Sequence, residues 1–368
     1  MSEISSVEKT RVLYLDFLRI LSIIAVITMH TSALLWNKTD VNTPYWQVFN
    51  FYDSFVRWAV PVFVMISGSL FLDPARKISL KQLFSKNILR MVRVYFLWSA
   101  LYACVHLLSE QRLKSASIEF LAHFIKGHYH LWFLYMIVGL YLITPLLRCM
   151  IKSREMIRYY LLLSLVFTFL IPTILCALQT VDILFAPPQQ TYKVGLYDFG
   201  NSVYEQVRFY LTLGYSPYYV AGYYLSRREL NKRWAYLIYI MGAVGFLSTF
   251  FFTSIVSRHE NEAISLFYAY DRFNVFFESI AVFVFVKRAT ANGILELAKK
   301  LISGISKYVF GVYLIHVLVL SAFTRYIFDV FFIHPILSVP LISLCVFIIS
   351  ALLSIILNKI PIVRKYCL

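Results

Sequence analysis

The sequence predicts an all-α, polytopic membrane protein that forms a single domain over residues 1–368. Of these residues 60% are hydrophobic and only 15% are charged, and the mean hydropathy is +0.69. A water-soluble domain of this composition would have to cover its own surface with apolar side chains. Apolar runs of about 17 to 25 residues, the length that crosses a bilayer as a helix, recur along the whole chain. In lipid the alternative is a closed β-barrel, whose strands are about half as long.

About ten membrane-spanning helices are expected from these runs. The first run is too long for a signal-peptide core and has no small-residue cleavage pattern behind it, so we expect it to remain as an anchor. In order, the runs cover residues 12–36, 49–72, 83–109, 129–149, 159–180, 209–226, 234–257, 272–289, 306–328 and 337–358.

The connecting segments predict which way the helices are oriented. Lys and Arg gather before the first span and after the second, fourth, sixth, eighth and tenth. The intervening loops carry far fewer: Lys38 is alone in the first loop, and the last two spans have none between them. By the positive-inside rule, both termini are expected in the cytoplasm.

The first expected helix, RVLYLDFLRILSIIAVITMHTSALLW (11–36), carries Asp16, Arg19 and His30 within its apolar run. An Arg or Asp near the middle of a bilayer costs roughly 2.5 to 3.5 kcal/mol on insertion scales, so such groups normally face a polar cavity. Arg19 and His30 are eleven positions apart, which places them on nearly the same helix face, about 16.5 Å apart along the axis. Asp16 lies one turn before Arg19. We expect Arg19 to anchor phosphate and His30 to be a titratable group nearer the outer surface.

Arg90 and Arg93 lie one turn apart at the inner end of the third span, in LRMVRVYFLW. Two interpretations stay open for this pair. Basic residues at an inner helix end are what orients a helix, and two guanidinium groups so placed also bind phosphate.

The segment GHYHLWFLY, at the outer end of the fourth span, brings His130, Trp132 and Tyr135 together. Trp and Tyr at this depth are typical of the interfacial aromatic belt. Aromatic ring faces flanked by polar groups also suit a sugar-like acceptor, so both interpretations stay open.

Other polar groups inside the spans are weaker clues. Asp53 and Arg57, at i and i+4, are expected to form a self-neutralising pair at a helix end. Glu278 in the eighth span and His316 in the ninth are single polar groups. Each is either functional or engaged in an interhelical hydrogen bond.

Composition also excludes some classes of protein. The net charge of +16 does not indicate nucleic-acid binding, because apolar runs interrupt the Lys and Arg residues and no continuous basic face forms. The five cysteines include no CxxC pair, so neither a disulfide framework nor a metal site is expected. Ser67 and Gly68, in MISGSL, are expected to let two helices approach closely.

The segment DFLRILSIIAVITMH, with ten residues between Arg19 and His30, resembles the first-helix motif of the membrane acyltransferase-3 family. Four further segments resemble that family's other signatures, in its order and across nearly the full chain. They are PVFVMISGSLFL (61–72), LRMVRVY (89–95), HLWFLYMIVGLYLITPLL (130–147) and KYVFGVYLIHVLVL (307–320). The resemblance is to the standalone type, similar to the O-acetyltransferase of enterobacterial common antigen, and an appended extracellular hydrolase-like domain is not expected.

The family transfers acyl groups, commonly acetyl from cytoplasmic acetyl-CoA, to hydroxyls of cell-envelope glycans. The resemblance therefore implies acetyl-CoA as the donor without a metal, an envelope glycan or glycolipid as the acceptor, and a multi-pass location in the bacterial inner membrane. It also implies that His30 is the essential histidine, that Arg19 is its partner, and that Arg90 and Arg93 are the paired arginines of the cytoplasmic-side motif.

On this hypothesis the three arginines hold the phosphates of CoA, and the pantetheine arm reaches His30, which acts as a general base or is itself acylated. Asp16 neutralises Arg19 while the site is empty. The fourth-span cluster binds the acceptor, and Glu278 and His316 support the site.

Two other classes of function stay open. A secondary transporter of a glycan or lipid precursor would equally contain buried ionisable groups and about ten spans, although the chain shows no repeat symmetry between its halves. A pure assembly protein would leave Arg19 and His30 unexplained. The sequence does not indicate an oligomeric state.

Overall fold

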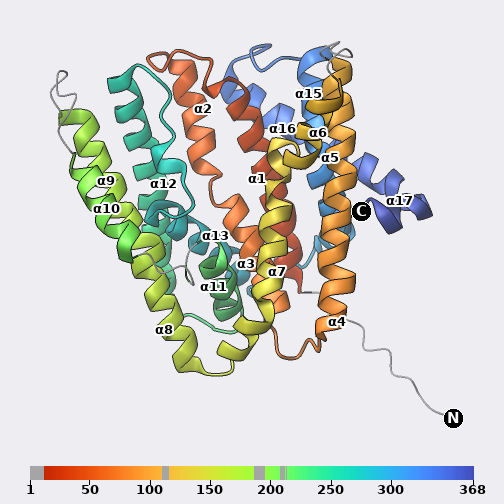
Figure 1. Ribbon diagram of the computed structural model, residues 1–368, viewed down its shortest axis with the longest axis horizontal. Coiled ribbons are helices and arrows are strands. Elements are labelled where there is room, and N and C mark those ends of the chain that lie inside the picture. The colour runs from red at the N-terminus through yellow and green to blue at the C-terminus, as the bar shows by residue number, and fades with distance from the viewer. Residues whose placement is uncertain (1–11, 110–115, 186–194, 208–211, 213) are drawn as a thin grey trace.

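The computed structural model describes residues 12–109, 116–185, 195–207, 212 and 214–368. Within these ranges the chain forms helices and their connections, with no strand. The long helices lie side by side, and most run from one end of the molecule to the other (Figure 1). The all-α fold class predicted from the apolar runs is therefore confirmed.

Within the described residues, eight helical segments are long and apolar enough to cross a membrane. This makes the chain a multi-pass integral membrane protein. The segments are Leu13–Trp36, Pro44–Phe71, Leu80–Leu108, Phe120–Met150, Arg154–Phe185, Lys232–Glu260, Lys299–Tyr326 and Pro335–Lys359.

Several of these segments consist of two consecutive helices. The α-helices are α1 (Leu13–Trp36), α2 (Pro44–Phe55), α3 (Ala59–Phe71), α4 (Leu80–Gln82), α5 (Leu89–Ser109), α6 (Ala116–Lys126), α7 (Trp132–Met150), α8 (Arg154–Ser164), α9 (Ile171–Phe185), α10 (Leu196–Val207), α11 (Ser216–Ser226), α12 (Lys232–Glu260), α13 (Phe273–Ala291), α14 (Lys299–Ile305), α15 (Val309–Tyr326), α16 (Pro335–Lys359) and α17 (Pro361–Tyr366).

Two of the ten expected spans are not among the eight. The expected span over 209–226 lies partly outside the described residues, and its described part, α11, has 11 residues, or about 16 Å of helix. The expected span over 272–289 corresponds to α13, which is less apolar because it contains Glu278, Lys287 and Arg288. The count of ten and the cytoplasmic location of both termini stay predictions.

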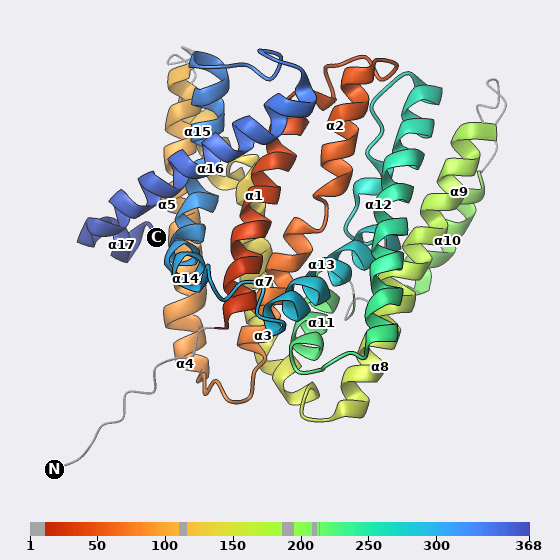
Figure 2. The ribbon, with the colours of Figure 1, turned by 180° about the vertical axis from the view of Figure 1, so that it is seen from behind.

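Helix α1 lies at the centre of the molecule. It packs against α2, α3, α13, α14, α15 and α16, and most of its residues are buried. Seen from behind, α16 runs obliquely across α1 and leads to α17 at the side of the bundle (Figure 2). The central position of α1 explains why a helix with Asp16, Arg19 and His30 is accommodated, since these side chains meet protein instead of lipid.

Helices α3 and α11 approach each other closely at glycine positions. A Cβ atom at Gly68 would lie 1.8 Å from the carbonyl oxygen of Tyr219, and one at Gly222 would lie 2.1 Å from that of Met65. Only residues without a side chain fit this spacing. The packing role expected for Gly68 is therefore confirmed.

The α-helical backbone is interrupted at 56–58, 127–131 and 261–272, and the last two of these segments each contain one short 3-10 helix, Tyr129–Leu131 and Leu266–Tyr268. Irregular backbone at membrane depth is tolerated where it is buried in protein or lines a cavity. The first and third of these segments meet, because the guanidinium of Arg57 lies 4.0 Å from the ring centroid of Tyr268. The breaks thus concentrate polar backbone in the interior of the bundle.

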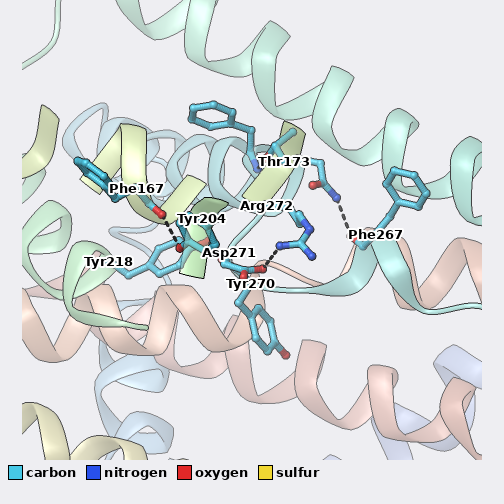
Figure 3. Close-up of polar contacts among 10 residues, drawn as sticks. Phe167, Thr173, Tyr204, Tyr218, Phe267, Tyr270, Asp271 and Arg272 are labelled. Carbon is cyan, nitrogen blue, oxygen red and sulfur yellow. Dashed lines mark hydrogen bonds and ion pairs between the residues drawn. The ribbon is translucent and has the colours of Figure 1, made fainter. Parts of the chain in front are cut away.

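The longest of these segments, 261–272, follows α12 and leads to α13. The hydroxyl of Tyr218 on α11 donates to the carbonyl of Tyr270 at 2.7 Å, and Arg272 pairs with Asp271 at 2.6 Å (Figure 3). These bonds fix the segment against α11 and determine where the Tyr270 side chain lies.

Candidate active site

One cavity of about 400 Å³ lies beside α1. Five of the predicted site residues line it: Arg19, Arg90, His30, His130 and Trp132. Arg19 and His30 are separated by about 16.5 Å along the axis of α1. A single space therefore connects a cationic end with an imidazole end and can take an extended ligand.

The cationic end contains Arg19, Arg90 and Lys307. The Nη1 atom of Arg19 contacts Oδ1 of Asp16 at 2.6 Å, and Asp16 is buried. The Nε atom of Arg90 donates to the carbonyl of Leu368 at 3.1 Å. Guanidinium and ammonium groups on a cavity wall suit phosphate, which accepts charge-assisted hydrogen bonds from them.

At the imidazole end His30 and His130 line the cavity, and the ring of His316, which is not part of the lining, contacts both. The ring of His30 stacks on that of His316, with centroids 5.4 Å apart, and His316 lies 5.3 Å from His130. His316 is fully buried and His130 is 2% exposed. Neither Nε2 atom has a hydrogen-bond partner among the described residues, and a buried imidazole nitrogen without a partner is available to a ligand or a proton.

Tyr313 on α15 forms hydrogen bonds with two of these histidines. Its backbone carbonyl accepts a hydrogen bond from Nδ1 of His316 at 2.6 Å, which makes Nδ1 the protonated nitrogen in the neutral ring. Its hydroxyl donates to the carbonyl of His130 at 2.6 Å. The Nδ1 atoms of His130 and His128 lie 3.0 Å apart.

Aromatic rings close the cavity near His30. Trp132 packs against Tyr270 with ring centroids 6.3 Å apart and against Tyr215 at 5.6 Å. The hydroxyl of Tyr270 lies 4.0 Å from the sulfur of Met29, one residue before His30. Broad ring faces with a hydroxyl between them form a surface that suits an amphipathic ligand.

Five predicted site residues do not line this cavity. Asp16 and His316 contact the lining residues Arg19 and His30, whereas the other three are bonded or buried elsewhere. Arg93 donates to the carbonyls of Tyr366 and Lys365, because the segment after α16 docks against that face of α5. The hydroxyl of Tyr135 donates to the carbonyl of Ile125 at 2.9 Å. Glu278 is buried in α13 and is not part of the cavity lining.

Sequence reasoning missed Tyr270 and Lys307 as members of the cavity wall. Lys307 follows Ser306 and begins the apolar segment KYVFGVYLIHVLVL. A charged residue at the start of an apolar run is a sequence signal that could have marked it as a site candidate. Tyr270 has no sequence signal, because it lies in an irregular segment whose position depends on tertiary contacts. The expected Asp53–Arg57 pair is confirmed, with Nη2 and Oδ1 2.6 Å apart.

The described residues contain no group of three or more His, Cys, Asp or Glu side chains arranged to hold a metal ion. Of the three histidine rings here, that of His316 contacts both His30 and His130. The chemistry available to this site is that of an imidazole beside a cationic channel.

Residues 12–359 match the family model of the acyltransferase-3 family, which describes an acyltransferase domain. The chain belongs to the acyltransferase-3 family. No curated protein and no solved structure matches it. The match covers nearly the whole chain, so this member of the acyltransferase-3 family is a multi-pass membrane acyltransferase, and the transporter alternative is not favoured.

Proposed function

We propose that this acyltransferase transfers an acetyl group from cytoplasmic acetyl-CoA to a hydroxyl of a cell-envelope glycan or glycolipid in the bacterial inner membrane. The observation that carries the proposal is the continuous cavity that contains Arg19 and Arg90 at one end and His30 at the other. In acetyl-CoA a long arm separates the phosphates from the terminal thioester. The cavity likewise separates its arginines from His30, so the two can be matched end to end.

The donor enters with its phosphates at the cationic end. Arg19 and Arg90 supply planar guanidinium groups that take phosphate oxygens in pairs. The pantetheine arm then occupies the apolar middle of the cavity, which Ile66, Phe133 and Ile137 help to line. This places the thioester beside His30.

His30 acts as the general base in this proposal. The acceptor O–H bond breaks and its proton passes to His30 while the hydroxyl oxygen attacks the thioester carbonyl. The C–S bond then breaks, and the imidazolium returns the proton to the departing thiolate, which leaves as the free thiol. Acylation of His30 followed by transfer to the hydroxyl is the covalent variant.

The acceptor meets the aromatic end of the cavity. Trp132 and Tyr270 offer ring faces, and His130 offers a buried nitrogen without a partner among the described residues. This set leaves room for a sugar hydroxyl next to His30. The residues that we propose to bind the acceptor are therefore His130, Trp132 and Tyr270, and Tyr135 is no longer among them.

His30→Ala tests the proposal in the purified protein. The variant should lower ester formation on an acceptor by ~10²- to 10⁴-fold, the usual contribution of a general base, and bind CoA as the wild type does. His259→Ala is the matched control, because His259 is exposed in the last turn of α12 and does not line the cavity. Wild-type ester formation by the His30 variant would contradict the mechanism.

A further inference from the structure

A second cleft, of about 870 Å³, lies where α1, the connection between α3 and α4, and the π-helical segment η1 (Leu83–Ile88) meet. Arg19 and Leu70 line both this cleft and the cavity that contains His30. The two spaces therefore share a wall. The cleft lies at the arginine end of the cavity, away from His30.

Three basic side chains line this cleft and not the cavity: Arg76, Lys77 and Lys86. All three are exposed. No carboxylate of the described residues forms an ion pair with any of them. Their charges are therefore available to an anion.

The carboxylates of the cleft are already engaged. Asp16 pairs with Arg19 at 2.6 Å. Asp73 forms an ion pair with Arg227, which directly follows α11. Since each of these charges is balanced within the protein, the three basic side chains leave the cleft with a net positive charge.

The cleft is a built feature of the fold. The Nη2 atom of Arg148 on α7 donates to the carbonyls of Asp73 and Arg76, at 2.7 and 2.6 Å. The side chain of Ser79 accepts from the backbone of Gln82, whose own side chain accepts from the backbone of Ser79. These bonds fix both ends of the segment that carries Arg76 and Lys77.

We infer that this cleft binds the 3′-phosphoadenosine diphosphate end of CoA, with Lys77 and Lys86 contacting the 3′-phosphate. The inference rests on the proposed function, in which the pantetheine arm occupies the cavity. The arm is attached to the diphosphate, which then lies at Arg19 on the shared wall. The adenosine and its 3′-phosphate continue outward into the cleft, where Gln82 and Asn87 provide polar groups for the base.

Another basic cleft, of about 450 Å³, is less suited to this ligand. Lys152, Arg154 and Arg228 are among its lining residues. It shares no lining residue with the cavity that contains His30, so a nucleotide bound there would have no direct path for its arm to the imidazole.

The test compares CoA with 3′-dephospho-CoA by isothermal titration calorimetry on the full-length protein in detergent. The wild type should bind CoA more tightly. Lys77→Gln and Lys86→Gln should each weaken CoA binding about three- to tenfold, as expected for one lost lysine–phosphate contact, and leave 3′-dephospho-CoA binding unchanged. Lys81→Gln is the matched control, since Lys81 is exposed on α4 and does not line the cleft; it should change neither.

Equal binding of the two compounds by the wild type overturns the inference alone, whereas binding of neither overturns the proposed function together with it. An equal effect of Lys81→Gln would show a general effect of positive charge and also overturns the inference. A third result also overturns the inference: the Lys77 and Lys86 variants keep the preference for CoA over 3′-dephospho-CoA but lose binding to phosphatidylglycerol vesicles. The cleft would then bind lipid headgroups.

Discussion

Replacing His316 by Leu should slow acetyl transfer without abolishing binding of acetyl-CoA. In the proposed mechanism His30 takes the acceptor proton and becomes an imidazolium, and its ring is stacked 5.4 Å from that of His316, with the two planes 24° apart. A cation over the face of Trp, Tyr or Phe is stabilised by about 2 kcal/mol when the pair is desolvated, and we expect the same order for the neutral imidazole of His316. Leu removes that face, so kcat should fall by roughly 30-fold.

The same substitution has a small structural cost. His316 is fully buried, and Leu has a similar volume, so the substitution leaves no large cavity. The hydrogen bond from Nδ1 to the Tyr313 carbonyl is lost, which costs about 1 kcal/mol. The variant should therefore remain folded, which thermal unfolding in detergent would check.

The assay is steady-state ester formation with kcat and KM determined separately. His316→Phe keeps an aromatic face and should lose less activity than His316→Leu. A folded Leu variant with wild-type kcat would refute this reasoning. So would equal losses in the Leu and Phe variants, because the ring face would then contribute nothing.

Three further predictions follow from the site and the fold. Arg90→Ala should weaken CoA binding about tenfold, and Arg93→Ala should have a smaller effect because Arg93 does not line the cavity; titration of both variants with CoA checks this, and equal losses would contradict it. Trp132→Ala should raise KM for the acceptor and leave KM for acetyl-CoA unchanged, whereas Tyr135→Ala should change neither; a raised acceptor KM in the Tyr135 variant would refute the placement. Gly222→Val should destabilise the fold by roughly 1 to 3 kcal/mol, because its Cβ would lie 2.1 Å from a backbone oxygen of α3; an unchanged unfolding temperature would argue against this packing.

The placement of Arg19 and His30 could be predicted because both lie on one helix. Within a helix the pitch alone determines which residues share a face and how far apart they are. The structure shows both side chains on the lining of one cavity. The Asp16–Arg19 and Asp53–Arg57 pairs were predictable for the same reason, since their partners lie three and four positions apart.

The separation of Arg90 from Arg93 could not be predicted. The two residues lie one turn apart, and either face of α5 could have met the cavity. Both guanidinium groups bond to the segment that follows α16, Arg93 to Lys365 and Tyr366 and Arg90 to Leu368. Only Arg90 also lines the cavity, and this depends on how α5 packs against the other helices. Tyr135 is a similar case, since its hydroxyl bonds to the end of α6.

The sequence by itself determined the all-α class, the apolar helices and the spacing of charged groups along each helix. Those properties depend on the residues within one segment and on the absence of water around it. Only the tertiary structure decided that Tyr270 and Lys307 join the cavity, that the imidazoles of three helical segments meet, and that a basic cleft adjoins the arginine end of the cavity. These features arise from contacts between segments far apart in the chain, and the periodicity of a single helix carries no information about its neighbours.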